Sequence, residues 1–331
     1  MRPDRGTGPE GVLSVHFARV ISWLLELGGD PGGDAGGRSR RLRFTFAAVL
    51  VATSIVGALS GLLHLWVHVQ NDFLTDVPAY YNAAQRLNAG EPLYPPGADP
   101  DLADYYRYPP LLAILARPFA LLPFPVFAAL WEAGTIVVLY LFVYRLGFTR
   151  RTAIAMGLLG SQLGDVVGIG QAHAHVAWLM ALGTPWSIAL AGQLKLFPAL
   201  IALYWIGRGE YRQFVPFVAW SLGLIVFQFV LGPGNLFDFA KELTLENVGN
   251  FDNWSPYAIS PGLWFALVLA FALITPFAAR TRFGWPIAVF YATLVNPRLF
   301  GYHLLTLGAA LRKPDDETAK PLILPKAVQG R

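Results

Sequence analysis

The sequence has no cysteine and few charged residues. None of its 331 residues is Cys, and only 14% are Asp, Glu, Lys or Arg. Without cysteine, disulfides, thiolate metal ligands and cysteine nucleophiles are excluded. Soluble domains carry roughly 25% charged residues, so the low charged fraction argues against a protein whose whole surface faces water.

Apolar and aromatic side chains dominate instead. Hydrophobic residues make up 55% of the chain, the mean hydropathy is +0.46, and there are 23 Phe, 13 Tyr and 10 Trp. This composition is typical of an integral membrane protein, for which the lipid bilayer is the solvent. The net charge of +4 does not indicate a nucleic-acid partner, because the basic residues fall at the ends of apolar segments rather than in one patch.

The first apolar stretch sets the expected orientation. Residues 44–66 carry no Asp, Glu, Lys or Arg, and we interpret them as a retained anchor because they exceed a usual signal-peptide core. Residues 12–27 have helical periodicity and are expected to lie on the inner membrane surface. A basic cluster just before the anchor places the N-terminus in the cytoplasm, and the following loop outside, by the positive-inside rule: Arg38, Arg40, Arg41 and Arg43.

Further apolar segments predict an all-α polytopic fold. Full spans are expected at 124–146, 214–231 and 262–279. Residues 153–206 have basic residues on both sides, which requires an even number of crossings, and their Gly and Pro residues predict broken or re-entrant helices. Residues 283–311 are too few for two full crossings and predict a hairpin that turns at Asn296-Pro297-Arg298.

Together these segments predict about eight membrane-spanning helices plus one or two re-entrant or interfacial helices. The multi-pass chain is expected in the cell membrane with both termini cytoplasmic. Its expected parts are a cytoplasmic amphipathic segment with a Gly-rich linker (1–43), a membrane domain (44–312) and a disordered cytoplasmic tail (313–331).

Asp76 is a candidate catalytic base. It follows the first apolar stretch by ten residues and heads a polar run that contains Tyr80 and Tyr81. A carboxylate held beside aromatic residues at the outer membrane face could act on a lipid-borne substrate. Alternatives remain open. Asp76 could be a solvated charge or the N-cap of a helix, and Asp72 is a competing candidate for the base.

A second polar segment, GIGQAHAH, occupies residues 168–175. On a helix, His173 and His175 point in different directions, so they do not form a metal-binding pair of the i,i+4 type. We expect Gln171 and these histidines to form hydrogen bonds in a polar cavity, and Asp165 could pair with one of the histidines.

Charged residues within apolar runs mark two further candidate positions. Lys195 and Glu132 each lie inside such a run, which is costly unless the charge is paired or functional. The alternative is a buried ion pair between Lys195 and either Glu132 or Asp165. Arg298, at the tip of the predicted hairpin with His303 nearby, could bind a phosphate, and an ion pair with an outer-loop acid explains it equally well.

These motifs resemble glycosyltransferase family 87. The resemblance runs in order through YPPL at 108–111, GQ at 170–171, KLFP at 195–198 and a late basic and histidine segment. It covers residues 44–311 and begins with the pattern D-x3-YY-x2-A-x5-G-x3-Y, which is carried by Asp76, Tyr80, Tyr81, Ala84, Gly90 and Tyr94.

The resemblance implies a GT-C fold and an inverting transfer of a sugar, commonly mannose, from a polyprenyl-phosphate donor to a glycolipid or glycan on the non-cytoplasmic face. By this similarity Asp76 is the general base. The donor phosphate would be bound by Arg298, Lys195 and His303, and the acceptor or cavity side chains would be Tyr80, Tyr81, Gln171, His173 and His175. No metal or other cofactor is implied.

Two observations bear on alternatives. The residues after GQ read Ala-His-Ala-His, where the family often has asparagine, so the sugar or acceptor could differ. A lipid or glycan transporter or flippase would also use broken helices and intramembrane charges, but the inverted repeats typical of transporters are not found in this sequence.

Overall fold

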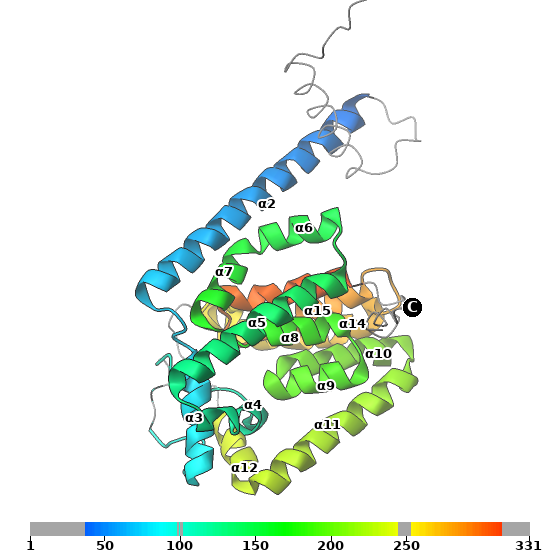
Figure 1. Cartoon of the computed structure of the whole chain (residues 1–331). Helices are drawn as coiled ribbons and strands as arrows, with labels where there is room; N and C mark the ends of the chain where they lie inside the picture. The colour runs from blue at the N-terminus through cyan, green and yellow to red at the C-terminus, as the bar shows by residue number, and fades with distance from the viewer. Residues whose placement is uncertain (1–36, 98, 100–101, 244–252, 313–331) are drawn as a thin grey trace, which may run out of the picture.

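The computed structural model describes residues 37–97, 99, 102–243 and 253–312 (Figure 1). Within these ranges the chain forms α-helices and short 3-10 helices and no strand. The segment 12–27 and the tail 313–331, for which we made predictions, lie outside the described residues.

Most of the described helices are joined by a few residues, and residues 90–109 form a long connection between two of them. In chain order they are α2 (Gly37–Asn71), α3 (Val77–Ala89), α4 (Pro110–Ala116), η1 (Phe119–Leu121), α5 (Phe124–Leu146), α6 (Arg150–Leu158), α7 (Gly160–Ile169), α8 (His173–Leu182), α9 (Pro185–Leu194), η2 (Phe197–Ile201), α10 (Ala202–Arg208), α11 (Tyr211–Leu231), α12 (Pro233–Glu242), α13 (Pro256–Ile259), α14 (Pro261–Ala278), α15 (Gly284–Leu294) and η4 (Gly301–Leu311).

Within the described residues, four helices are long and apolar enough to cross a membrane, and they coincide with the four full spans predicted from the sequence. They are Phe44–Asn71 of α2, α5, α11 and α14. Between 6% and 28% of each apolar window is buried inside the protein. Because the remaining apolar side chains face outward, these helices have the surface of a multi-pass membrane protein.

The predicted total of about eight spans is not confirmed. Four helices of the described chain qualify, or five if α6 and α7, which meet at an angle of 64°, form one broken span. The region predicted to cross twice folds instead as α6 to α10, which have 7 to 10 residues each. A span needs ~20 residues, so this part consists of the short helix pieces that its glycines and prolines predicted.

α2 lies across α6 and α7 along a line of glycines (Figure 1). A Cβ atom added at Gly61 would lie 2.2 Å from the carbonyl oxygen of Gly160, and one at Gly164 would lie 2.2 Å from that of Gly61. Only residues without a side chain allow helices to approach this closely, as is common in membranes. The close contact fixes α2 against α7 along their lengths.

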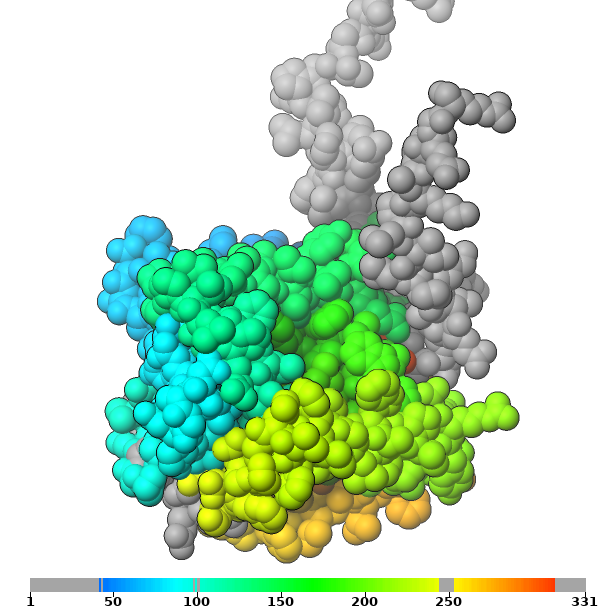
Figure 2. Space-filling model, turned by 60° about the horizontal axis from the view of Figure 1, so that its bottom comes forward, coloured from blue at the N-terminus to red at the C-terminus, as the bar shows by residue number. Residues whose placement is uncertain are grey.

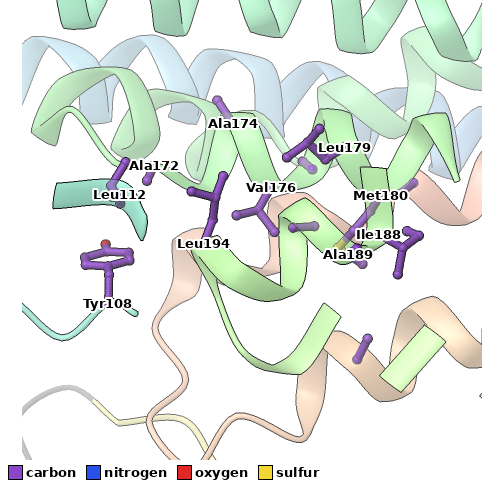
Figure 3. Close-up of a cluster of buried hydrophobic side chains, with 14 of the residues drawn as sticks. Tyr108, Leu112, Ala172, Ala174, Val176, Leu179, Met180, Ile188, Ala189 and Leu194 are labelled. Carbon is purple, nitrogen blue, oxygen red and sulfur yellow. The ribbon is translucent and has the colours of Figure 1, made fainter. Parts of the chain in front are cut away.

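The interior of the protein is formed by the short helices. Figure 3 shows buried side chains of α8 and α9, among them Val176, Met180 and Ile188, with Tyr108 and Leu194 at one end of the cluster. The largely buried α4 packs against α3 and α12, and Figure 2 shows α3 (cyan) and α12 (yellow) close together on the surface. Tyr108 therefore connects the buried core to the loops in which the predicted site residues lie.

Candidate active site

Asp76 is held against the end of α7 by two backbone hydrogen bonds. The chain leaves α2 through a turn at Leu74, whose φ of 58° is the one positive value at a non-glycine residue in the described chain. The Leu74 N–H donates to the carbonyl oxygen of Gly168 (2.8 Å), and the Asp76 N–H donates to that of Ile169 (3.0 Å). Asp76 precedes α3, but its side chain makes no capping bond. Its position is therefore set by α7.

The close approach of α3 to α7 depends on Gly170. Its φ is 73°, and a Cβ atom there would lie 2.4 Å from Cγ2 of Val77. A side chain at this position would therefore be strained and would also collide with the start of α3. Trp131 of α5 seals the turn, because its Nε1–H donates to the Gly170 carbonyl oxygen (2.8 Å).

Gln171 is the centre of the polar cluster. Its Nε2 donates to Oδ2 of Asp76. Its Oε1 accepts from the hydroxyl of Tyr108 (2.8 Å) and lies 3.1 Å from Nδ1 of His173. Gln171 is buried, so its amide is oriented by these partners, and it fixes the carboxylate of Asp76 in turn.

The environment raises the basicity of Asp76. Burial raises its pKa from the ordinary value near 4 to about 6, while the hydrogen bond from Gln171 and the positive charges of Lys195 and Arg107 act in the opposite direction. A carboxylate with a pKa of about 6 is ionised at neutral pH and is still a stronger base than a solvated aspartate. This combination suits general-base catalysis.

Aromatic rings form the wall behind Asp76. The ring of Tyr80 lies 4.6 Å from that of Trp131 and 5.3 Å from that of Tyr108. The hydroxyls of Tyr80 and Tyr108 are 3.0 Å apart, and the Ala172 N–H donates to the Tyr80 hydroxyl (3.2 Å). The wall joins α3, α5 and the turn before α8.

Cations also lie near this cluster. Lys195 follows the last residue of α9 and places Nζ 4.3 Å from the centre of the Tyr108 ring. Arg298 is buried, with its guanidinium 5.0 Å from the centre of the Phe300 ring. Burial and the nearby Arg298 lower the pKa of Arg107. Three positive side chains from separate segments thus share one region with Asp76.

Two histidines complete this region. The rings of His173 and His303 are 4.1 Å apart, and both are buried. The Phe300 N–H donates to Nδ1 of His303 (3.1 Å), so Nε2 of His303 carries the ring proton when the ring is neutral. Tyr302 stacks on His303 with its ring centre 4.8 Å away.

Most of the predicted site residues come together, and two do not. Tyr81 packs against Phe124 and Phe127, and its hydroxyl donates to the Leu122 carbonyl oxygen. His175 faces Trp131, with the ring centres 5.2 Å apart, while His173 faces His303. These two side chains therefore line the outside of the cluster.

The predicted pairings of Asp165 and Lys195 were wrong. Asp165 does not pair with His173 or His175, because its Oδ1 accepts from His64 and His68 of α2. Lys195 does not reach Asp165 or Glu132, and within the described chain neither carboxylate oxygen of Glu132 has a hydrogen-bond partner. The α2 to α7 contact was not visible in the sequence, so the partner of Asp165 could not be identified.

The sequence-based reasoning assigned no role to Arg107, Tyr108, Trp131 or Tyr302. Tyr108 lay within the YPPL motif, and Arg107 directly precedes it, so the motif was the available signal. Trp131 and Tyr302 carry no local signal, because their partners lie on other helices. In the described residues, no group of three or more His, Asp or Glu side chains is arranged to hold a metal ion.

The chain is similar to known proteins. The family model of glycosyltransferase family 87 matches residues 106–312. A relative from Mycolicibacterium smegmatis is 30% identical over 199 residues, which are 54% of this chain and 46% of the relative. A relative from Mycobacterium tuberculosis is 29% identical over 187 residues, which are 50% of this chain and 43% of the relative.

Both relatives are named polyprenol-phosphate-mannose-dependent alpha-(1-2)-phosphatidylinositol pentamannoside mannosyltransferase. The matched part of this chain spans less than half the length of either relative. No solved structure matches the chain.

Proposed function

We propose, from the premise that this chain belongs to glycosyltransferase family 87, that it transfers a mannosyl group from a polyprenyl-phosphate donor to a glycolipid or glycan acceptor on the non-cytoplasmic face. The observation that carries the proposal is a single carboxylate of raised pKa beside a group of cations. The printed activity of the two relatives supports the donor class.

In the proposed reaction Asp76 is the general base. The acceptor hydroxyl gives its proton to the Asp76 carboxylate while its oxygen attacks the anomeric carbon of the donor. The bond between that carbon and the phosphate oxygen breaks, and polyprenyl phosphate leaves with the bonding electrons. Attack from the face opposite the leaving group inverts the anomeric configuration. One carboxylate suffices, because the phosphate leaves as an anion and needs no general acid.

The cationic region is the proposed phosphate site. Lys195 and Arg298 are suited to stabilise the charge that develops on the leaving phosphate, and Arg107 adds to the same positive field. A guanidinium can bind two phosphate oxygens at once, whereas a lysine acts as a point charge. Nε2–H of His303 is a further donor for this phosphate.

An apolar groove beside Arg298 supports a lipid donor. It has a volume of about 360 Å³ and lies between α14 and α15, with Trp264, Leu267, Phe271, Phe290, Leu294 and Leu299 in its wall. Leu299 directly follows Arg298, and its carbonyl oxygen accepts from the Trp254 N–H (2.8 Å). Leu299 thus places one wall of the groove next to Arg298 in the chain, and another wall is α14, which is long and apolar enough to cross a membrane. We assign it to the polyprenyl chain of the donor.

Transfer of radiolabelled mannose from polyprenyl-phosphate mannose into lipid, in membranes that contain the protein, tests the proposed function. We expect transfer by the wild type, and loss of at least about 100-fold in Asp76→Asn at equal protein level. Asp104→Asn is the matched control, because Asp104 is an exposed acid of the outer loop between α3 and α4. Full activity of Asp76→Asn would overturn the assignment of the base. Movement of lipid without a new glycosidic bond would indicate a flippase.

Donors of different chain length test the groove. Leu267→Trp fills the groove and should raise KM for a long polyprenyl donor, while a donor with a two-isoprene chain, too short to fill the groove, should be used as by the wild type. Leu273→Trp is the control on the same helix, since Leu273 is 66% exposed and is not part of the groove wall. An equal effect of Leu267→Trp on both donors would contradict the assignment.

A further inference from the structure

A chain of four ionisable side chains crosses the contact between α2 and α7, outside the site described above. His68 of α2 lies between two carboxylates: Nδ1 is 2.8 Å from Oδ1 of Asp72, and Nε2 is 3.3 Å from Oδ1 of Asp165. The same Asp165 oxygen is 2.7 Å from Nδ1 of His64. Asp165 thus joins two successive turns of α2 to α7.

Both ring nitrogens of His68 face carboxylate oxygens. A carboxylate accepts hydrogen bonds, so a ring nitrogen that carries a proton donates to the carboxylate it faces. The charged and titratable groups that face His68 are His64 of α2, Asp72, which directly follows α2, and Asp165 of α7.

His68 also touches the segment that positions the base. A Cβ atom at Gly168 would lie 2.6 Å from Cβ of His68, so the His68 side chain packs directly against the backbone of Gly168. The carbonyl oxygen of Gly168 accepts from Leu74, and that of the next residue, Ile169, accepts from Asp76. The left-handed turn at Leu74 is unfavourable for a residue with a side chain. These contacts to α7 are what hold it.

We propose that His68, which bridges Asp72 and Asp165, is a positioning residue that holds the Leu74 turn on α7 and so keeps Asp76 beside Gln171. Loss of the bridge loosens this turn. Transfer then falls because the base is misplaced, while donor binding at the cationic region is unchanged. The inference rests on the proposed role of Asp76.

Kinetics of His68→Gln test the role. Glutamine has a single N–H donor group, at the end of its side chain, and cannot contact both carboxylates. We therefore expect kcat to fall on the order of 10-fold, with donor KM within about 2-fold, because a small misplacement of a catalytic group is costly. His64→Gln is the matched control: it removes a neighbouring bond to the same Asp165 and leaves the His68 bridge, so kcat should stay within about 2-fold.

A double-mutant cycle separates the bridge from general packing. Asp165→Asn should lower kcat as His68→Gln does, and the double variant should be no slower than either, because all three lack the same bridge. Additive losses, or equal losses in His68→Gln and His64→Gln, would overturn the inference in favour of a merely structural contact.

Hydrogen exchange gives a readout that does not require activity. The amides of Leu74 and Asp76 should be protected in the wild type and in His64→Gln at the same pH, and should exchange faster in His68→Gln. This result is expected even if the protein transfers a sugar other than mannose, so the inference and the proposed function can fail separately. Unchanged exchange in His68→Gln would refute the positioning role.

Discussion

Removing the amide of Gln171 should shift the pH dependence of transfer. In the structure Gln171 donates to the Asp76 carboxylate, and this bond lowers the pKa of Asp76 against the larger effect of burial. A hydrogen bond to a charged group contributes about 1.5–3 kcal/mol, which corresponds to about one to two pKa units. In Gln171→Leu the pKa of Asp76 should therefore rise from about 6 to between about 7 and 8.

The direction of the change in activity with pH follows from the role of Asp76 as the base. Asp76 accepts a proton only when it is ionised, so activity rises with pH through its pKa. At pH 7 a group of pKa about 6 is roughly 90% ionised, whereas one of pKa between about 7 and 8 is roughly 10–50% ionised. Gln171→Leu should thus lose about 2- to 10-fold in rate at pH 7 and recover most of it near pH 9.

The assay is kcat/KM for the donor measured from about pH 5 to pH 9, with the wild type expected to show its acidic limb near 6. Gln228→Leu is the matched control, because Gln228 is a fully buried glutamine that bonds to Gln193 between α9 and α11. Its acidic limb should coincide with that of the wild type. An acidic limb that stays near 6 in Gln171→Leu would refute the link between this amide and the base.

Three further predictions concern stability and binding. Asp76→Asn should raise the unfolding temperature at pH 8. The pKa of Asp76 is raised to about 6 in the folded protein, so the wild type loses stability as the pH rises from about 4 through 6, by no more than about 3 kcal/mol. This gain in unfolding temperature should vanish at pH 4. A gain that persists at pH 4 would show that ionisation of Asp76 is not its cause. Lys195→Gln should raise donor KM about 10- to 100-fold, because one charge-assisted contact to the donor is lost. Lys241→Gln is the control and should raise donor KM much less, because Lys241 is exposed on α12 and pairs with Asp238. Gly61→Leu should sharply reduce the yield of folded protein in detergent chromatography, because the added Cβ would lie 2.2 Å from a backbone oxygen of α7. At Gly223 an added Cβ meets nothing within 4 Å, so Gly223→Leu should leave the yield near that of the wild type.

Hydropathy alone was sufficient to predict the four long spans. Each is a continuous apolar run, and the cost of exposing such a run to water is a property of the run itself. The count of about eight is not confirmed, in part because residues 153–206, where two crossings were expected, form helices of 7 to 10 residues. Whether a broken helix crosses, bends or returns depends on its neighbours, which composition does not define.

In the candidate site, too, the sequence predicts single residues but not their neighbours. Asp76, Gln171 and Arg298 could be selected because each is a polar residue at an unusual place in an apolar sequence. Their contacts could not be predicted, since Gln171 reaches Asp76 across 95 positions of the chain. The His68 bridge was missed for a related reason. Its partner Asp165 lies on a helix whose contact with α2 depends on glycines, and glycines carry no polar signal.

The arrangement of charges also connects donor binding to the strength of the base. Lys195 and Arg107 lower the pKa of Asp76, while burial raises it to about 6. A donor phosphate held by these cations would neutralise part of their field, so the carboxylate would become more basic when the donor is bound. The acidic limb of kcat, which reports the bound enzyme, should then lie at higher pH than that of kcat/KM, which reports the free enzyme. The same cations that stabilise the leaving phosphate would in this way keep the base weak until the donor is in place.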